Sequence, residues 1–189
     1  MPVSKSAFRA ALFAVAAAGL TALPAYAQMA DPVMVGGAPM YASKNIIENA
    51  VNSKEHTTLV AAVKAAGLVA TLSGPGPFTV FAPTDAAFGK LPAGTVETLV
   101  KPENKGTLTS ILTYHVVAGK LGAADIVAAI KAGGGSAVLT TVQGGKLTGS
   151  LMGDKVMLTD AKGGMSMVTI ADVNQSNGVI HVVDTVVLP

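Results

Sequence analysis

The spacing of apolar residues in the first half of the chain is typical of helices. Four segments place apolar side chains three and four positions apart, which predicts amphipathic helices: residues 45–51, 58–66, 102–113 and 125–132. Gly67 follows the second segment and Gly133 follows the fourth. Because glycine commonly occupies the position just after a helix, both helices are expected to end there.

The second half of the chain changes to short strand-like runs separated by glycine-containing turns. These runs cover residues 138–142, 146–151, 156–159, 167–172 and 179–187. The last run follows Asn177-Gly178, a strong turn signal, and holds too few polar residues to keep one face in water. It is therefore predicted to be a central strand buried on both faces. Helices first and strands later predict an α+β fold.

A strand, a sharp turn and a short helix are predicted over residues 79–88. Residues 79–82 form a β-branched and aromatic run, and Pro83 then interrupts the ladder because it has no N–H group. Thr84 is placed to cap the following helix, and Asp85 puts a negative charge at the positive end of the helix dipole.

The N-terminal segment has the layout of a secretory signal peptide. Lys5 and Arg9 give a basic start, residues 10–23 are apolar, and Ala25-Tyr26-Ala27 is a small-x-small cleavage site. The apolar stretch is shorter than the roughly 20 residues that span a bilayer, so no membrane span is expected. We therefore predict a signal peptide over 1–27, a leader or tether over 28–43 and one domain over 44–189, in an extracytoplasmic location that is periplasmic or secreted.

Charge argues against a nucleic-acid partner. Removal of Lys5 and Arg9 reduces thirteen basic residues to eleven lysines, which balance the eleven acidic residues. No arginine remains, and the lysines are scattered singly, whereas nucleic-acid-binding proteins usually carry a clustered basic face. The chain also has no cysteine, so its stability must come from its apolar core without disulfides.

The histidines are predicted to have structural roles in preference to catalytic or metal-binding roles. His115 follows a predicted helix and His181 lies in the terminal strand, where a buried imidazole must be hydrogen-bonded. No His-x-x-x-His pair or carboxylate-rich cluster predicts a metal site, and no cofactor is expected. A triad of a serine, His115 or His181, and Asp184 stays open as a weak hydrolase alternative, because such residues meet in space and not in order.

Methionines gather in the strand-rich half, and core filling is the prediction for them. They are Met152, Met157, Met165 and Met167. Met165 and Met167 would share one face of a strand, which suits packing and also soft ligation of Cu(I), the weaker alternative.

Two segments of this sequence resemble the signature stretches of the fasciclin-like domain family. They are residues 79–88 and 177–189, and Tyr114-His115 lies between them, where that family carries a Tyr-His motif. The resemblance covers residues 44–189 and implies a wedge of packed β-sheets with helices covering one side. It assigns structural roles to Thr84, Asp85, Asn177, Gly178, His181 and Asp184, and partner binding to Tyr114, His115, Val116 and Val117.

The family resemblance implies a secreted, non-enzymatic binding module that mediates adhesion. Its expected partner is a cell-surface protein, a matrix component or a polysaccharide. The alternative is a carrier of an apolar small ligand, such as a carotenoid or lipid, because some members of the family bind such molecules. The undetected hydrolase is the second alternative.

Overall fold

The computed structural model describes residues 32–189, so the predicted signal peptide lies outside the described residues. The predicted leader segment contains a two-stranded antiparallel hairpin of β1 (Val33–Val35) and β2 (Ala38–Met40). Val35 and Met40 are buried in the main core, so this hairpin is part of the folded body. The sequence did not predict that packing.

The helices concentrate in the first half of the chain, as predicted. They are α1 (Ile46–Ala50), α2 (Thr57–Ala66), α3 (Val69–Ser73), α4 (Asp85–Gly89), α5 (Thr95–Leu99), α6 (Lys105–Tyr114) and α7 (Ala123–Ala132), with a 3-10 turn η1 (Pro102–Asn104) before α6. The predicted helices all form, within a few residues of the expected bounds. Gly67 adopts the left-handed conformation that ends α2.

A seven-stranded sheet occupies the rest of the fold, in the order β4-β3-β9-β8-β7-β6-β5. Its strands are β3 (Phe78–Pro83), β4 (Val116–Ala118), β5 (Ser136–Thr140), β6 (Lys146–Met152), β7 (Lys155–Thr159), β8 (Met165–Gln175) and β9 (Gly178–Val183). A bridge between Val117 and Thr141 and a 2.7 Å bond from the Val142 N–H to the Val116 carbonyl link the two outer strands. The sheet therefore curves back on itself.

Strand β9 lies between β3 and β8, and each of its six residues is buried. It pairs with β3 in parallel, with Phe81 opposite His181, and with β8 in antiparallel orientation. The predicted central strand is confirmed, although it ends at Val183. The last residues continue without strand structure, and Val186 and Val187 return to the core.

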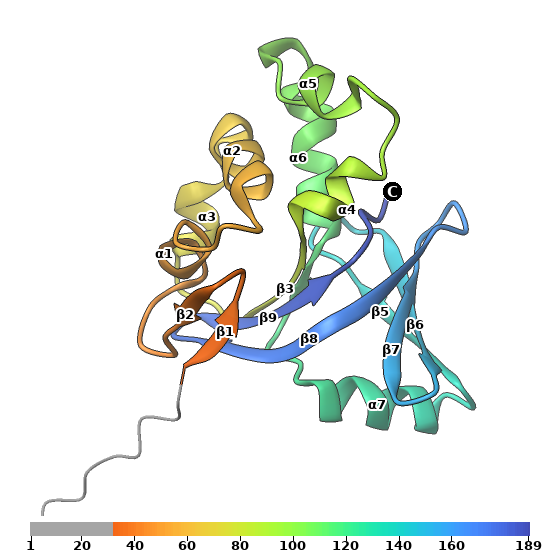
Figure 1. Ribbon diagram of the computed structural model, residues 1–189. Coiled ribbons are helices and arrows are strands. Elements are labelled where there is room, and N and C mark those ends of the chain that lie inside the picture. The colour runs from red at the N-terminus through yellow and green to blue at the C-terminus, as the bar shows by residue number, and fades with distance from the viewer. Residues whose placement is uncertain (1–31) are drawn as a thin grey trace, which may run out of the picture.

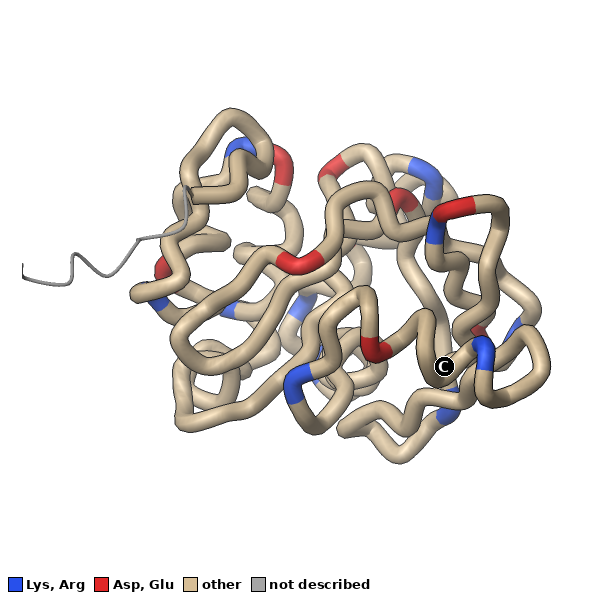
Figure 2. Tube along the Cα trace, turned by 90° about the horizontal axis from the view of Figure 1, so that it is seen from below, with Lys and Arg blue, Asp and Glu red and all other residues tan. Residues whose placement is uncertain are grey.

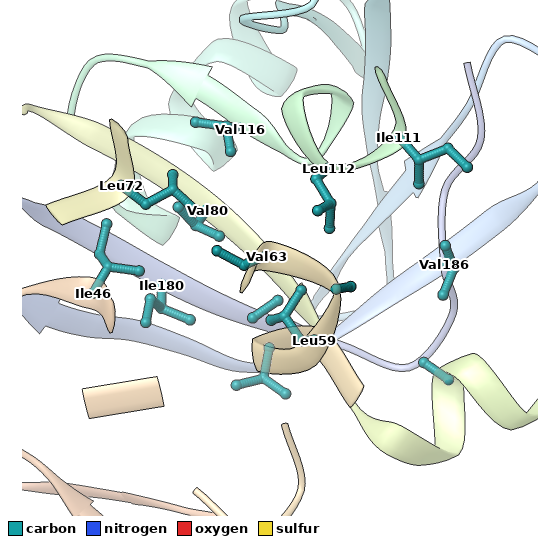
Figure 3. Close-up of a cluster of buried hydrophobic side chains, with 14 of the residues drawn as sticks. Ile46, Leu59, Val63, Leu72, Val80, Ile111, Leu112, Val116, Ile180 and Val186 are labelled. Carbon is teal, nitrogen blue, oxygen red and sulfur yellow. The ribbon is translucent and has the colours of Figure 1, made fainter. Parts of the chain in front are cut away.

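Two apolar cores lie on opposite sides of the curved sheet. The first packs helices α1, α2, α3, α4 and α6 against β3 and β9, and Figure 3 shows Leu59 and Val63 of α2 close to Val80 and Ile180. The second is enclosed by α7, whose Ile126 and Ile130 lie among residues of β5 to β8. In Figure 1, α7 lies below the sheet, away from the other helices. The architecture is a mixed α+β fold.

Candidate functional site: a buried signature and an open sheet face

Tyr114, the last residue of α6, is completely buried. Its hydroxyl donates to the Lys146 carbonyl at 2.6 Å and accepts from the Ala161 N–H at 3.2 Å. Burial raises the pKa of this hydroxyl, so Tyr114 stays protonated. The side chain thus ties the start of β6 to the turn between β7 and β8.

His115 is buried beside Tyr114 and joins helix α6 to the C-terminal segment. Its Nδ1 lies 2.8 Å from the Ile111 carbonyl, and its Nε2 accepts from the Val187 N–H at 3.2 Å. Since a carbonyl only accepts, the ring is neutral with the proton on Nδ1. Burial lowers the pKa of His115 to about 4, which keeps this state at neutral pH.

Val116 and Val117 continue from His115 into β4, and both side chains are buried. The structure therefore brings together the four residues predicted to bind a partner, but it leaves none of them on the surface. Their direct contact with a partner stays a prediction. In this structure they hold α6, β4 and the C-terminal segment in place.

Thr84 and Asp85 occupy the turn between β3 and α4. The Thr84 hydroxyl accepts from the Ala87 N–H at 3.2 Å and caps α4. The Asp85 carboxylate reaches α2 instead, where it accepts from the Thr57 hydroxyl at 2.7 Å and the Thr58 N–H at 2.8 Å. Partial burial opposes the charge, but these hydrogen bonds outweigh it and lower the pKa of Asp85.

Asn177 connects three segments that are far apart in sequence. Its side-chain oxygen accepts from the Ile46 N–H at 3.1 Å, and its amide donates to the carbonyls of Leu72 and Gly74 at 2.8 and 3.0 Å. The next residue, Gly178, lies so close to β3 that an added Cβ would be 2.0 Å from the Phe78 carbonyl oxygen. Only glycine permits this approach.

His181 and Asp184 hold neighbouring strands. His181 stacks on Phe81 with 5.6 Å between ring centroids, and its Nε2 donates to the Leu121 carbonyl at 2.8 Å. The Asp184 carboxylate accepts from the Met167 N–H at 2.8 Å and forms a 3.3 Å ion pair with Lys90. Burial lowers the pKa of His181, whereas for Asp184 the hydrogen bonds and Lys90 outweigh partial burial and lower its pKa.

Ser53 and His56 form a buried pair that the sequence did not predict. The Ser53 Oγ lies 2.8 Å from His56 Nδ1, and both residues are 2% exposed. His56 Nε2 is buried without a hydrogen-bond partner, and burial lowers the pKa of this ring. The three-residue spacing before α2 was the available signal, but it is too common to single out.

Two small apolar cavities lie between helices α1 and α2 and strand β3. One has a volume of about 30 Å³ and includes His115 in its wall, and the other has about 20 Å³ and includes His56. They share the lining residues Ile46, Ala50, Leu59 and Val80. A ligand larger than a few atoms would require α1 and α2 to move away from β3.

The outward side of strands β5 to β8 is not covered by a helix in Figure 1, and we call it the open face. It consists of Ser136, Val138, Thr140, Lys146, Thr148, Ser150, Met152, Lys155, Met157, Thr159, Met165 and Met167, all exposed or half-buried. Val138 is 60% exposed, Met152 52% and Met165 59%. Core filling, the prediction for the methionines, is therefore wrong for Met152 and Met165.

The charged residues of the open face are Lys146 and Lys155. Elsewhere, Figure 2 shows basic and acidic positions scattered singly along the chain. Within residues 32–189, no three histidine, aspartate or glutamate side chains gather as metal ligands do. No helix of this described part combines the length and apolar character that a membrane crossing requires.

Comparison with known proteins defines the family. The model of the fasciclin domain matches residues 54–189. The chain is 48% identical over 156 residues to protein sll1483 of Synechocystis, across 82% of this chain and 79% of that protein. It is 34% identical over 185 residues to the cell surface glycolipoprotein MPB83 of Mycobacterium bovis, across 86% of this chain and 76% of that protein. The chain belongs to the fasciclin-domain family.

A solved structure shares the fold. The FAS1 domain pair from the insect cell adhesion molecule fasciclin I matches with a TM-score of 0.68 at 19% sequence identity. The match covers 77% of this chain and 51% of that one, so the present chain spans about half the length of the solved pair. At this identity the match establishes the fold alone.

Proposed function

We propose that this protein is a secreted, non-enzymatic binding module that mediates adhesion through its open face. The partner is a cell-surface protein, a matrix component or a polysaccharide. Family membership and the cell-surface relative MPB83 support the proposal. The observation that carries it is the exposure of Val138, Met152 and Met165 on one sheet face, because several large apolar side chains exposed on a face with few charges are typical of interaction sites.

The buried signature residues act on this face through the fold. Tyr114 bonds to Lys146, the first residue of β6, and to Ala161, in the turn that leads into β8. Both bonds lie at one end of the open face. Tyr114→Ala would remove them together with a fully buried ring, so it would disturb the fold as well as any surface that depends on it.

Substitutions on the surface test adhesion without this difficulty. Val138→Lys places a charge on the open face. The control, Val51→Lys, places the same charge outside that face, at a valine 48% exposed just after α1. In a binding assay on envelope preparations, purified matrix polymers and polysaccharides, we expect Val138→Lys to weaken binding at least about tenfold and Val51→Lys to leave it unchanged. Equal effects of the two variants would refute the open face as the adhesive surface.

The carrier of an apolar ligand is the second candidate, and the paired cavities beneath α1 and α2 favour it. Their walls are apolar apart from Lys64 and His115 in the larger cavity and His56 in the smaller one. The buried Nε2 of His56 has no hydrogen-bond partner and offers one hydrogen bond to a ligand. A carrier should yield a carotenoid or lipid on extraction, seen by absorbance or mass spectrometry. Ala50→Leu, which fills the shared wall, should abolish that recovery, whereas adhesion should survive removal of lipid.

Hydrolysis has less support from the geometry. Both ring nitrogens of His115 and of His181 are engaged by main-chain groups, so neither ring is free to take a proton from a serine. Ser53 and His56 do touch, but both are buried. Cleavage of generic esters that is lost in Ser53→Ala would overturn the non-enzymatic assignment.

A further inference from the structure

The methionines of the open face are not scattered but surround one of their number, Met157. On β7, Met157 lies directly opposite Met167 of β8 and opposite Ser150 of β6. Directly opposed residues of an antiparallel pair share a face, and so do residues two apart on one strand. Met165, two residues before Met167, and Met152, two residues after Ser150, are therefore the diagonal neighbours of Met157.

This arrangement brings four thioethers within reach of a common point above Met157. Opposed Cβ atoms in such sheets are about 5 Å apart, and diagonal neighbours are about 7–8 Å apart, which long side chains can span. Methionine has three rotatable bonds and adjusts readily. Met157 and Met167 are half-buried, so their positions are restricted, whereas Met152 and Met165 are free to close over them.

These side chains are not needed for the apolar core of this half of the protein. The opposite sides of the same strands supply that core through Leu147, Leu158 and Val168, which pack around Ile126 of α7. The hydrophobic effect therefore does not explain why methionine, and not a more polar residue, occupies neighbouring outward positions on three successive strands.

The surrounding chemistry selects the type of ligand. Hard cations such as Mg²⁺ and Ca²⁺ take oxygen ligands, chiefly carboxylates, and the open face carries none. Asp184, just after β9, lies beside Met167 on the edge of β8 that faces away from β7. Its carboxylate is already engaged by the Met167 N–H and by Lys90. Neutral thioethers favour a soft monovalent ion.

We propose that Met152, Met157, Met165 and Met167 form a surface site for a soft monovalent metal ion, Cu(I) being the physiological candidate and Ag(I) an equivalent probe. Met157 and Met167 are its central ligands, and Met152 and Met165 complete it from either side. Lys155, opposite Met152, lies at the margin and limits the affinity through its charge. The site shares Met152 and Met165 with the proposed adhesive face, but leucine in place of methionine keeps that face apolar, so metal binding and adhesion can be tested separately.

The experiment is a competition for Cu(I) held by bicinchoninate under anaerobic reducing conditions. We expect the protein to withdraw one equivalent of Cu(I), and Met157→Leu and Met167→Leu each to weaken this at least about tenfold. Leucine matches methionine in volume, so unfolding by urea should stay unchanged in both variants. The matched control is Met34→Leu on β1, since Met34 is 56% exposed but lies outside the open face.

Methyl signals provide a readout that a structural role would not move. With methionine labelled by ¹³C at the ε-methyl group, Ag(I) should shift the signals of the four open-face methionines and leave those of Met34 and Met40 in place. Failure to withdraw Cu(I), or withdrawal that survives Met157→Leu, would overturn the proposal. So would an equal loss in Met34→Leu, because it would indicate nonspecific uptake by exposed thioethers.

Discussion

Individual polar side chains hold distant segments of this fold together, and the histidines do so only when neutral. His115 presents a proton to Ile111 from one nitrogen and accepts from the Val187 N–H with the other. A second proton would face that N–H donor inside the core. His181 has the same dependence with the opposite tautomer, because it accepts from the Asp172 N–H and donates to Leu121.

The protein should therefore lose stability in mild acid. The pKa of His115 falls from 6.5 to about 4 on folding, so the unfolded chain takes up its proton first as pH decreases. Stability is complete above about pH 6.5 and declines below it, by about 2 kcal/mol from His115 alone at about pH 5. His56 and His181 add to the loss because their pKa values are also lowered.

Urea unfolding at neutral and mildly acidic pH measures this loss. The lowered pKa values of Asp85 and Asp184 affect stability only below their ordinary value of 3.8, outside this window. His115→Gln should reduce the pH dependence by about 2 kcal/mol. An unchanged dependence in that variant would contradict the role given to His115.

Asn177→Ala tests a second connecting side chain. The change removes three hydrogen bonds to main-chain groups of Ile46, Leu72 and Gly74, so we expect unfolding free energy to fall by about 2–4 kcal/mol. Asn174→Ala, three residues earlier, removes only an exposed bond to the Asp172 carbonyl and should cost less than about 0.5 kcal/mol. Chemical denaturation compares the two, and similar losses would argue against the connecting role.

Among the structural elements, length and local chemistry decided what the sequence could predict. The ten-residue helices α2 and α7 show several turns of apolar periodicity and were found. The five-residue α3 and α5 give too few positions to define a period, whereas the equally short α1 was found because its apolar residues continue to Val51. Helix α4 was found because Pro83 marks the end of the strand and Thr84, which follows it, is a typical capping residue.

For the candidate sites, too, the sequence predicted some features and missed others. The signature residues could be located from sequence, but their burial depends on α6, β4 and the C-terminal segment meeting in space. The methionine group was recognised in the sequence together with Cu(I) ligation as the weaker alternative, but its outward placement was not predicted. Each methionine taken alone fits a core position, and only the register of β6, β7 and β8 shows that all four point outward around Met157.

The parallel pair of β3 and β9 depends on close approach at Gly178. A Cβ there would lie 2.0 Å from the Phe78 carbonyl oxygen, so Gly178→Ala must displace backbone, and we expect a loss of about 2–4 kcal/mol. Gly106→Ala in α6 meets no atom within 4 Å and should stabilise the protein by up to about 1 kcal/mol. Thermal unfolding followed by circular dichroism should show opposite shifts, and shifts of the same sign would contradict this account.

At the scale of the whole molecule, stability should be greatest where the two cores meet. Strands β3 and β9 contribute side chains to both cores, since Phe81 and Val183 face α7 while Val80 and Val182 face the other helices. Helix α5, in contrast, has no fully buried residue. Opening of β9 therefore requires disruption of the entire fold, whereas α5 can open locally.

Amide hydrogen exchange should reveal this difference. We expect amides of β3 and β9 to exchange only through global unfolding, and those of α5 to exchange faster by at least about a hundredfold. Mass spectrometry of peptides from the two regions measures both rates on one sample. Exchange in β9 as fast as in α5 would show that the centre of the sheet is not the last part to open.

The pairing of β3 with β9, in which Phe81 lies opposite His181, also determines the order of folding during synthesis. A ribosome that has produced the helices and β3 has not yet produced their central partner strand, so the growing chain has no stable sheet on which those helices can settle. Commitment to the native state waits until residues 178–183 emerge. Until then both apolar cores lack the strand that they share.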